Sequence, residues 1–309
     1  MPRPLLLGIV GDSGTGKTTL TRGLVRILGE SQATHIRGDD YLLYDREQRA
    51  ENGMTPLDPA ANHLDILEQH LHHLHSREAI LKPVYSHQDG TFGASEYVHP
   101  NDFTIVESML GFHTEGMRDA FDVRVFLDPP EDLRRRWKVQ RDCSRRGYST
   151  DEVLEELDRR ERDAESFVSP QRHHADIVVA FTPGDRDDEH LDVRLQLRPG
   201  LVHPDLSSVL AERPGAISLD RRDEEMVLWV RGTISTEHSE AIQEAIWEKM
   251  EFASHLRTER LGEFTIGTSL HRSETLAIAQ LLVLYQAVTG RAAIALGGAA
   301  ARVDRLPAR

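Results

Sequence analysis

Residues 5–19 read LLLGIVGDSGTGKTT, an apolar run that ends in a glycine-rich turn. The turn fits the spacing G-x-x-x-x-G-K-[ST] at Gly11, Gly16, Lys17 and Thr18. Glycines allow successive backbone N–H groups to turn inward around a polyphosphate, and the following helix points its positive end at the same anion. The lysine of this pattern reaches the β and γ phosphates, and the hydroxyl ligates Mg²⁺. A glycine-rich turn without a ligand is the alternative. The sequence therefore predicts a nucleotide site formed by Gly11, Asp12, Ser13, Gly14, Thr15, Gly16, Lys17, Thr18 and Thr19.

Composition restricts the partners that the chain can have. The formal charge is −14, which disfavours nucleic acid as a partner, and 33 of the 37 basic residues are arginine. No uninterrupted apolar run reaches the length of a membrane span, and the first predicted strand leaves no room for a signal peptide. The single cysteine, Cys143, excludes an intramolecular disulfide and suits a reducing compartment. We expect a cytoplasmic protein that binds neither membrane nor nucleic acid.

Short apolar segments alternate with helical patterns through about residue 180. Buried parallel strands read as such short apolar runs, and helices show apolar residues at spacings of three and four. The strands are expected at 5–10, 34–37, 103–106, 123–127 and 177–180, and the helices at 19–29, 62–75, 131–146 and 151–167. Ser149 and Glu152 form a possible capping box for the last helix. The pattern predicts an α/β fold with a doubly wound, mostly parallel sheet of P-loop kinase type, and ligands at the carboxyl ends of its strands.

The second part of the chain has a different pattern. Residues 183–190 carry a charge run with Pro and Gly, and we interpret them as a boundary between a core (1–182) and an extension (183–298). Residues 191–198 and part of 226–234 alternate between apolar and polar, which predicts antiparallel strands with one wet face. A long apolar helix is expected after Ser273, ending at Gly290. Residues 299–309 are expected to be a disordered tail. An exposed edge of the predicted antiparallel strands favours a homo-oligomer, a dimer or higher.

Acidic residues stand at the carboxyl ends of two predicted strands. Asp39 and Asp40 follow the second strand, where a carboxylate can accept the proton of an attacking hydroxyl. Asp39 is the better candidate for this base, because one of the pair is expected to cap a helix or face solvent. Glu107 ends the third strand, in the place of an acid that aligns with Mg²⁺ or its water. Pairing with an arginine is the alternative for Glu107.

Two helical segments are rich in residues that bind anions or metals. In residues 132–149, Lys138, Arg141 and Arg145 form a basic stripe, with Arg146 next to it. Such a segment over a triphosphate would neutralise transition-state charge, although a solvated basic face is the simpler reading. In residues 63–76, His70 and His73 share a helix face, and a solvated amphipathic helix is a better interpretation there than a metal site.

With these pieces placed, the chain resembles the phosphoribulokinase and uridine kinase family, and the phosphoribulokinase branch most closely. The resemblance runs from residue 5 to about 182. It rests on the P-loop and on the motifs GDDY…DR (38–46), TPLDPAANHLD (55–65), KPVYSH (82–87), WKVQRDCSRRGYS (137–149) and SPQRHHAD (169–176). It implies transfer of a phosphoryl group from ATP, with Mg²⁺, to the 1-hydroxyl of D-ribulose 5-phosphate, giving ribulose 1,5-bisphosphate.

The resemblance also implies roles for individual residues. Asp39 matches the catalytic base, and Lys17, Glu107 and Asp142 complete the implied catalytic set. Arg141 and Arg146 match nucleotide-binding positions, and Thr18 and Glu107 the metal site. The implied substrate contacts are Asp39, Tyr41, Arg46, Arg49, Tyr85, His87, Lys138 and Arg146.

The chain departs from the family pattern at three places. Leu42 and Leu110 stand where relatives carry histidine, and Ser108 replaces a glycine. Thr15 stands where plant relatives have a regulatory cysteine, so thiol regulation of that kind is not expected. The two leucines leave alternatives open for the acceptor: another sugar or polyol phosphate, or uridine or cytidine. A P-loop switch protein is disfavoured, because the chain lacks the guanine-reading motif N-K-x-D.

Overall fold

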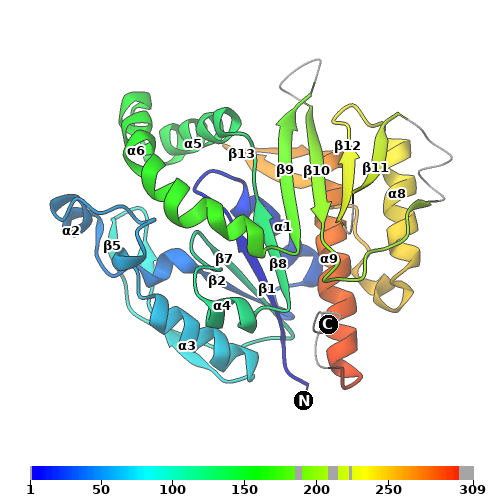
Figure 1. The fold of residues 1–309 in the computed structure, drawn as a ribbon, viewed down its shortest axis with the longest axis horizontal. Helices are drawn as coiled ribbons and strands as arrows, with labels where there is room; N and C mark the ends of the chain where they lie inside the picture. Colours follow the sequence, from blue (N-terminus) through cyan, green and yellow to red (C-terminus); the bar gives the residue numbers. More distant parts are fainter. Residues whose placement is uncertain (1, 185–189, 208–214, 223–224, 299–309) are drawn as a thin grey trace.

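The amino-terminal apolar run forms a central strand of an eight-stranded sheet in the computed structural model (Figure 1). The structure describes residues 2–184, 190–207, 215–222 and 225–298. The strand order is β11-β12-β10-β9-β8-β1-β7-β2. Strands β9, β8, β1, β7 and β2 run parallel, and β10, β12 and β11 continue the sheet in antiparallel fashion. The strands are β1 (Leu5–Val10), β2 (Ala33–Arg37), β7 (Phe103–Ser108), β8 (Val123–Leu127), β9 (Ile177–Pro183), β10 (Leu191–Leu197), β11 (Ile217–Arg222) and β12 (Glu225–Val230).

Helices cover both faces of this sheet (Figure 1). They are α1 (Lys17–Leu28), α2 (Arg46–Glu51), α3 (Leu64–His75), α4 (Glu115–Ala120), α5 (Glu131–Arg146), α6 (Thr150–Asp163), α8 (Thr236–Glu248) and α9 (Glu274–Ala295). Short 3₁₀ segments span Gly38–Tyr41, Pro59–Ala61, Ser169–His174 and Glu251–Leu256, and a π-helical turn spans Ala164–Val168. Small two-stranded ladders pair β3 (Ile80–Lys82) with β6 (Glu96–Val98), β4 (Tyr85–Ser86) with β5 (Thr91–Phe92), and β13 (Glu263–Ile266) with β14 (Ser269–Arg272).

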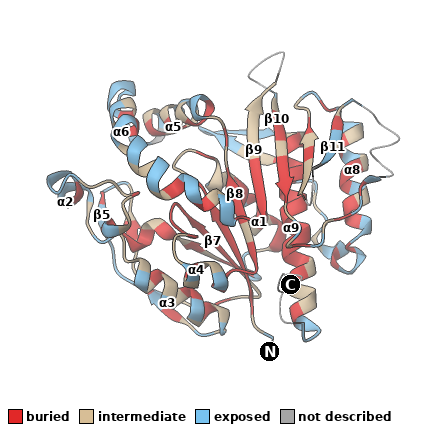
Figure 2. Ribbon diagram, viewed as in Figure 1, coloured by how far each residue is buried: buried red, intermediate tan, exposed pale blue. Residues whose placement is uncertain are grey.

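The sheet separates two hydrophobic cores, as the doubly wound prediction requires. Alternate residues of β1 point to opposite faces, since successive strand side chains alternate. Leu5, Leu7 and Ile9 belong to the core that includes α1, α8 and α9, whereas Leu6 and Val10 belong to the core on α3 and α4. Figure 2 shows the buried strands between partly exposed helices. Burial on both faces explains why these strands read as unbroken apolar runs.

The two halves of the chain share one sheet. The strands on either side of residues 183–190 pair with each other, from Leu191 opposite Pro183 to Leu197 opposite Ile177. The expected charged boundary itself lies largely outside the described residues, as does the expected tail at 299–309. The wet face predicted for β10 is wrong in part, because Asp192 and Gln196 are buried and hydrogen-bonded. The sequence did not predict β11 or α8.

Helix α9 runs further than predicted. It begins after the N-cap Ser273, as expected, but it passes through Gly290 and ends at Ala295. Interior glycine costs about 1 kcal/mol relative to alanine, and burial of this helix on nearly all sides outweighs that cost. By length and composition α9 is apolar enough to cross a membrane, but 78% of its most apolar window is buried inside the fold, as in a core helix.

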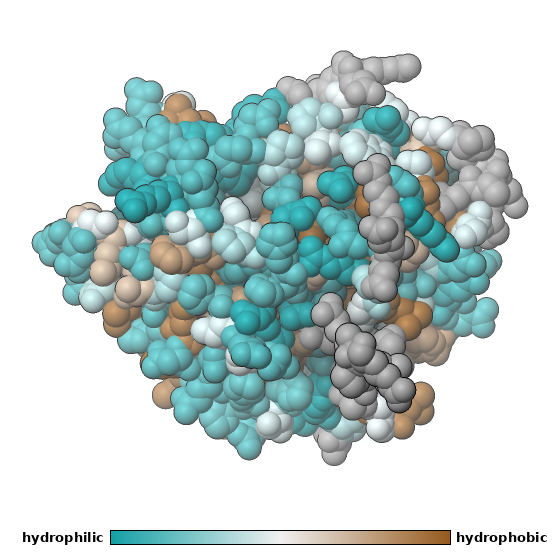
Figure 3. All heavy atoms as spheres, viewed as in Figure 1, coloured by the Kyte–Doolittle hydropathy of each residue, from teal (hydrophilic) through white to brown (hydrophobic). Residues whose placement is uncertain are grey.

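Polar residues dominate the surface of the α5–α6 hairpin. Figure 3 shows a largely hydrophilic face, including the region over these two helices. The boundaries of α5 agree with the expected 131–146, and the Ser149–Glu152 capping box at the start of α6 is present in both directions. Local sequence signals therefore predict the two helices of the hairpin. Tertiary contacts determine where the hairpin lies relative to the P-loop.

Candidate active site

The glycine-rich turn after β1 forms a P-loop that leads into α1. Gly14 (φ +88°) and Gly16 (φ +94°) have left-handed backbones that side chains rarely adopt, which explains glycine at both positions. The Thr15 hydroxyl donates to the Asp12 carbonyl at 2.8 Å and closes the loop. Lys17 Nζ donates to the carbonyls of Gly11 and Asp12 at 2.8 and 2.7 Å, so its ammonium lies over the loop.

Electrostatics around Lys17 suit an anion site. Burial lowers the pKa of Lys17, and the carboxylates of Asp39, Glu107 and Asp12 oppose this shift only in part. Binding of a phosphate removes little further water from an ammonium that is already desolvated. The free-energy cost of desolvation is therefore smaller than for a fully hydrated ammonium. Thr18 and Thr19 occupy the first turn of α1, where helix N–H groups face the same region.

Helix α5 packs directly over this loop. Arg134 donates from Nη1 to the Ser13 carbonyl at 2.9 Å, and the same nitrogen lies 2.9 Å from Asp12 Oδ2. Arg141 Nη2 donates to Ser13 Oγ at 3.3 Å. A Cβ on Gly14 would lie 3.0 Å from Lys138 Cβ, so glycine also permits the close approach of α5. Arg134 was not among the predicted site residues, although it lies in the predicted basic helix.

Asp39 lies on the 3₁₀ turn after β2 and faces the P-loop. Its Oδ2 is 3.0 Å from His87 Nε2, and the Asp39 side chain is 32% exposed. Burial acts to raise the pKa of Asp39, but the hydrogen bond and charge of His87, with the charges of Lys17 and Arg160, hold it well below its usual range. Asp39 is therefore an ionised, reachable carboxylate beside the phosphate loop.

Glu107 is the last residue but one of β7, next to the same loop. Its Oε1 accepts from the Thr18 hydroxyl at 3.4 Å and lies 3.4 Å from His35 Nε2. Burial acts to raise the pKa of Glu107, but His35 and Lys17 lower it overall. Among the described residues its Oε2 is buried and accepts no hydrogen bond. An orphaned carboxylate oxygen beside a threonine hydroxyl fits Mg²⁺ or its water, so Thr18 and Glu107 fit the predicted metal site.

Arginines from three helices surround Asp39. Arg46 is exposed at the start of α2, and its Nη2 donates to the His87 carbonyl at 2.5 Å. Arg49 donates from Nη2 to the Tyr85 hydroxyl at 2.9 Å. Arg146 of α5 and Arg160 of α6 both interact electrostatically with Asp39. Arg146 and Arg160 also pair with Asp142 and Glu156. Arg46 and Arg49 have no carboxylate partner among the described residues, and their guanidinium groups favour an anion in this region.

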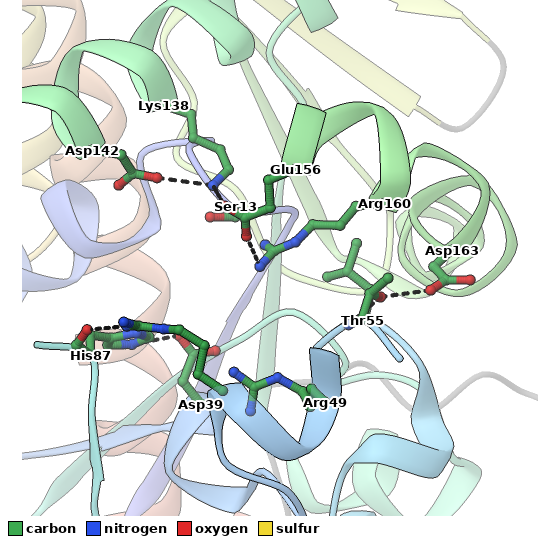
Figure 4. A network of polar contacts seen from close by, with 12 residues as sticks. Ser13, Asp39, Arg49, Thr55, His87, Lys138, Asp142, Glu156, Arg160 and Asp163 are labelled. Atoms are coloured by element: carbon green, nitrogen blue, oxygen red, sulfur yellow. Dashed lines mark hydrogen bonds and ion pairs between the residues drawn. The ribbon is translucent and has the colours of Figure 1, made fainter. Parts of the chain in front are cut away.

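A buried cluster lies in the α5–α6 hairpin. Lys138 Nζ is 3.0 Å from Asp142 Oδ2 and 3.4 Å from Glu156 Oε2, and Asp142 also pairs with Arg141 at 2.7 Å and Arg146 at 3.4 Å. Burial acts to raise the pKa of Asp142, but these cations hold it well below its usual range. Figure 4 shows this cluster on the opposite side of the site from the Asp39–His87 pair.

The structure thus divides the predicted site residues into two groups. Asp39, His87, Arg46, Lys17, Thr18 and Glu107 converge at the carboxyl ends of β1, β2 and β7. Five other predicted catalytic or substrate-contact residues are buried: Tyr41 (0% exposed), Tyr85 (3%), Lys138 (1%), Asp142 (0%) and Arg49 (8%). Direct substrate contact by Tyr41 is wrong for this structure, because its hydroxyl bonds to His70 Nδ1 at 2.9 Å within the core. Burial raises the pKa of Tyr41.

Sequence reasoning missed three residues of the site besides Arg134. His35 supports Glu107, Arg160 faces Asp39, and Asp40 is a buried ion-pair partner rather than a solvent-facing residue. His35 is a titratable residue within a predicted strand, which is a usable signal. The other two depend on contacts between segments distant in sequence. His70, by contrast, bonds to Tyr41, and no group of three metal-binding side chains forms anywhere in the described ranges.

One surface hollow of the described residues lies elsewhere. It measures about 750 Å³ and lies against α8, with Trp247, Arg257 and Arg272 in its lining. Arg257 already forms two hydrogen bonds with Glu244, at 2.7 and 2.8 Å. Side chains that already pair with each other give no sign of a ligand site in this hollow. The site at the carboxyl ends of β1, β2 and β7 therefore remains the candidate active site.

Comparisons with known proteins place the chain in a family. Residues 6–186 match the profile of the phosphoribulokinase / uridine kinase family, and because this is more than half of the chain, the protein belongs to that family. Phosphoribulokinase of Synechocystis sp. is 35% identical over 205 residues, which cover 65% of this chain and 62% of that relative. Chloroplastic phosphoribulokinase of Triticum aestivum is 29% identical over 64% of this chain and 55% of the relative. The chain thus spans less than two thirds of the length of these phosphoribulokinases.

Two further matches bear on the fold and on the range of relatives. Uridine kinase of Leuconostoc citreum is 34% identical, covering 57% of this chain and 87% of that protein. The solved structure of phosphoribulokinase from Rhodobacter spheroides has a TM-score of 0.58 at 18% identity, covering 82% of this chain and 99% of that one. The latter similarity confirms the α/β fold predicted from the sequence.

Proposed function

We propose that the protein is an ATP-dependent kinase that phosphorylates D-ribulose 5-phosphate to ribulose 1,5-bisphosphate. The observation that carries this proposal is the Asp39 carboxylate, ionised and about a third exposed, beside His87 and facing Lys17 of the P-loop. A base next to a phosphate cradle is what phosphoryl transfer to a hydroxyl requires. Family membership and the similarity to two phosphoribulokinases support the choice of acceptor.

The proposed roles follow from position. The P-loop, with Lys17, holds the β and γ phosphates of ATP, and Arg141 and Arg146 approach from α5. Asp39 accepts the proton of the 1-hydroxyl while that oxygen attacks the γ phosphorus, and the bond to the β–γ bridging oxygen breaks to release ADP. Mg²⁺ held by Thr18 and Glu107 would neutralise charge on the phosphates. Arg46, with the segment that carries His87, binds the phosphate that the sugar already bears.

A kinase of the same fold for another phosphorylated sugar or polyol is the second candidate. The observation that favours it is that Leu42 (3% exposed) and Leu110 (2%), which stand where the family pattern has histidine, are buried in the apolar core. Neither side chain offers a hydrogen bond, so any discrimination among acceptor hydroxyls comes from other residues.

An ADP-release assay tests both candidates. Purified protein is mixed with ATP, Mg²⁺ and one acceptor at a time: ribulose 5-phosphate, other pentose and tetrose phosphates, or uridine. We expect the highest kcat/KM with ribulose 5-phosphate, and a bisphosphate product by phosphorus NMR. A higher value with another sugar phosphate would establish the second candidate. Activity on uridine alone would overturn both, because Arg46 would then have no phosphate to bind.

A further inference from the structure

The carboxylate next to the proposed base has a different environment. Asp40 is 1% exposed, whereas the Asp39 side chain is 32% exposed. Asp40 Oδ1 accepts from Arg37 Nη2 at 2.9 Å and from the Tyr85 backbone N–H at 3.0 Å. Its Oδ2 accepts from Lys82 Nζ at 2.8 Å. Asp40 therefore receives three donors and has no surface from which to touch a substrate.

These donors join two segments that the site must align. Asp40 shares the 3₁₀ turn Gly38–Tyr41 with Asp39. Tyr85 opens β4, two residues before His87, and Lys82 ends β3. The Asp40 contacts therefore fix the β3–β4 segment against the turn after β2. The distance of 3.0 Å between Asp39 Oδ2 and His87 Nε2 spans the same two segments.

Lys82 strengthens this connection. It is 4% exposed and also lies 3.1 Å from Glu96 on β6, while its Nζ donates to the Pro83 carbonyl at 3.3 Å. Replacing a buried ion pair by apolar residues often leaves stability unchanged or improves it, so stability alone is a weak reason for such a cluster. Its directional contacts do fix geometry, and catalytic groups lose activity when they are misplaced by about 1 Å.

We propose that Asp40 is a positioning residue for the phosphoryl transfer. This proposal rests on the function proposed above. In it, Asp40 holds the β3–β4 segment so that His87 stays hydrogen-bonded to Asp39. Asp40 touches neither reacting atom, and its effect reaches the reaction only through the Asp39–His87 pair.

The test is the Asp40→Asn variant, which keeps the side-chain shape and removes the charge that binds Lys82 and Arg37. We expect kcat to fall roughly ten- to hundredfold with an unchanged KM for ATP. The carbon NMR titration of the Asp39 carboxyl supplies a readout that needs no substrate. The charged groups facing Asp39 are His87, Lys17, Glu107, Arg146 and Arg160. Displacement of His87 should raise the pKa of Asp39 toward its usual value, whereas loss of the Asp40 charge acts to lower it, so a rise reports the movement of His87.

A matched control uses the same segment. Asp89→Asn removes an exposed carboxylate whose contact is the Ser86 hydroxyl, at 2.7 Å, and should leave kcat and the Asp39 titration unchanged. Lys82→Met gives a second, independent variant, which keeps the Tyr85 and Arg37 contacts to Asp40. It should shift the Asp39 titration in the same direction as Asp40→Asn, by less.

The outcomes separate this proposal from the proposed function. If Asp40→Asn lowers only the melting temperature, with kcat and the Asp39 titration of the folded variant at wild-type values, Asp40 is merely structural and the proposal is wrong. If the Asp40→Asn variant does not fold, an unchanged Asp39 titration in the Lys82→Met variant overturns the proposal that Asp40 is a positioning residue. If wild-type protein phosphorylates no acceptor, the proposed function fails, while the titrations still decide whether Asp40 sets the Asp39–His87 geometry.

Discussion

Asp39 and Asp142 lie in two regions that face each other across the site. Burial and neighbouring cations shift the pKa of both carboxylates in the same directions. In both, burial acts to raise the pKa and neighbouring cations lower it further than burial raises it. Yet among the described residues Asp39 has a single ion-pair partner, His87, and about a third of its side chain is exposed. Asp142, by contrast, is buried among Lys138, Arg141 and Arg146. A lowered pKa therefore does not by itself identify a base. Accessibility decides which of the two carboxylates is able to accept a proton from a substrate.

The two regions also use their positive charges differently. In the α5–α6 hairpin, Lys138 is bound to Asp142 and Glu156 and therefore stabilises the hairpin itself. At the strand ends, the described hydrogen bond of the Arg46 side chain goes to the His87 carbonyl, and its guanidinium lies 6.0 Å from the Tyr148 ring centroid. A guanidinium without a carboxylate partner keeps its charge available for a phosphate. Substitutions in the two regions should therefore have different signatures.

The largest expected effect belongs to Asp39. The Asp39→Asn variant should lose roughly 10³- to 10⁴-fold in kcat, because the amide accepts no proton from the attacking hydroxyl. Its affinity for ATP, measured by calorimetry, should be close to that of the wild type. Retained turnover in the ADP-release assay would remove Asp39 as the base and end the distinction between the two carboxylates.

The next effect is on stability, in the α5–α6 region. Asp142→Asn should lower the free energy of unfolding by about 3 kcal/mol, because it leaves the buried Lys138 without its nearest anion. Urea denaturation followed by circular dichroism measures this change. Asp158→Asn on α6 is the matched control: its carboxylate is exposed and pairs with Arg135, and exposed pairs contribute at most about 1 kcal/mol.

The same variant should change how stability depends on pH. A folded-state pKa below the unfolded value of about 3.9 means that Asp142 contributes stability above that pH and loses it as the pH falls through the folded pKa. The wild type should therefore lose stability steadily below about pH 4. In Asp142→Asn this loss should be shallower, and an identical slope would show that Asp142 does not titrate as inferred.

A smaller effect is expected from His87→Gln. The hydrogen bond and charge of His87 help to keep the pKa of Asp39 low, so the wild type should show no acid limb from Asp39 between pH 5 and 8. The variant should raise that pKa toward about 4, its usual value, and lower kcat/KM roughly tenfold. The pH profile of kcat/KM for the sugar phosphate measures both. A wild-type profile in the variant would mean that Lys17 and Arg160 alone hold Asp39 ionised.

The smallest effect lies outside both regions. Ser273 caps α9 by accepting from the Leu276 N–H at 3.2 Å. Ser273→Ala should lower the free energy of unfolding by about 1 kcal/mol, since the cap is lost while the buried helix remains. Neither kcat nor the KM for ATP should change. A loss of activity would show that α9 is coupled to the site through α1.

Local signals in the sequence were enough to predict much of the fold and part of the site. The P-loop spacing, the β1 and β8 boundaries, helix α5 and the Ser149–Glu152 capping box depend on residues close together in the chain, and all are present. Strand β11 and helix α8 were missed because their patterns are weak, and α9 passes Gly290 because packing outweighs the local cost of glycine. The placement of Asp39 and Glu107 at strand ends followed from the rule that parallel strands end at one edge.

The sequence by itself determined the phosphate loop, the alternating strands and helices, and the acids that follow the strands, because each of these depends on spacing within a few residues. Only the tertiary structure decided that Asp39 is reachable while Asp40 and Asp142 are buried. It also decided that Tyr41 is turned into the core, and that Lys138 pairs with Asp142 and Glu156. Burial and ion pairing depend on which distant segments pack together, and a pattern of neighbouring residues does not contain that information.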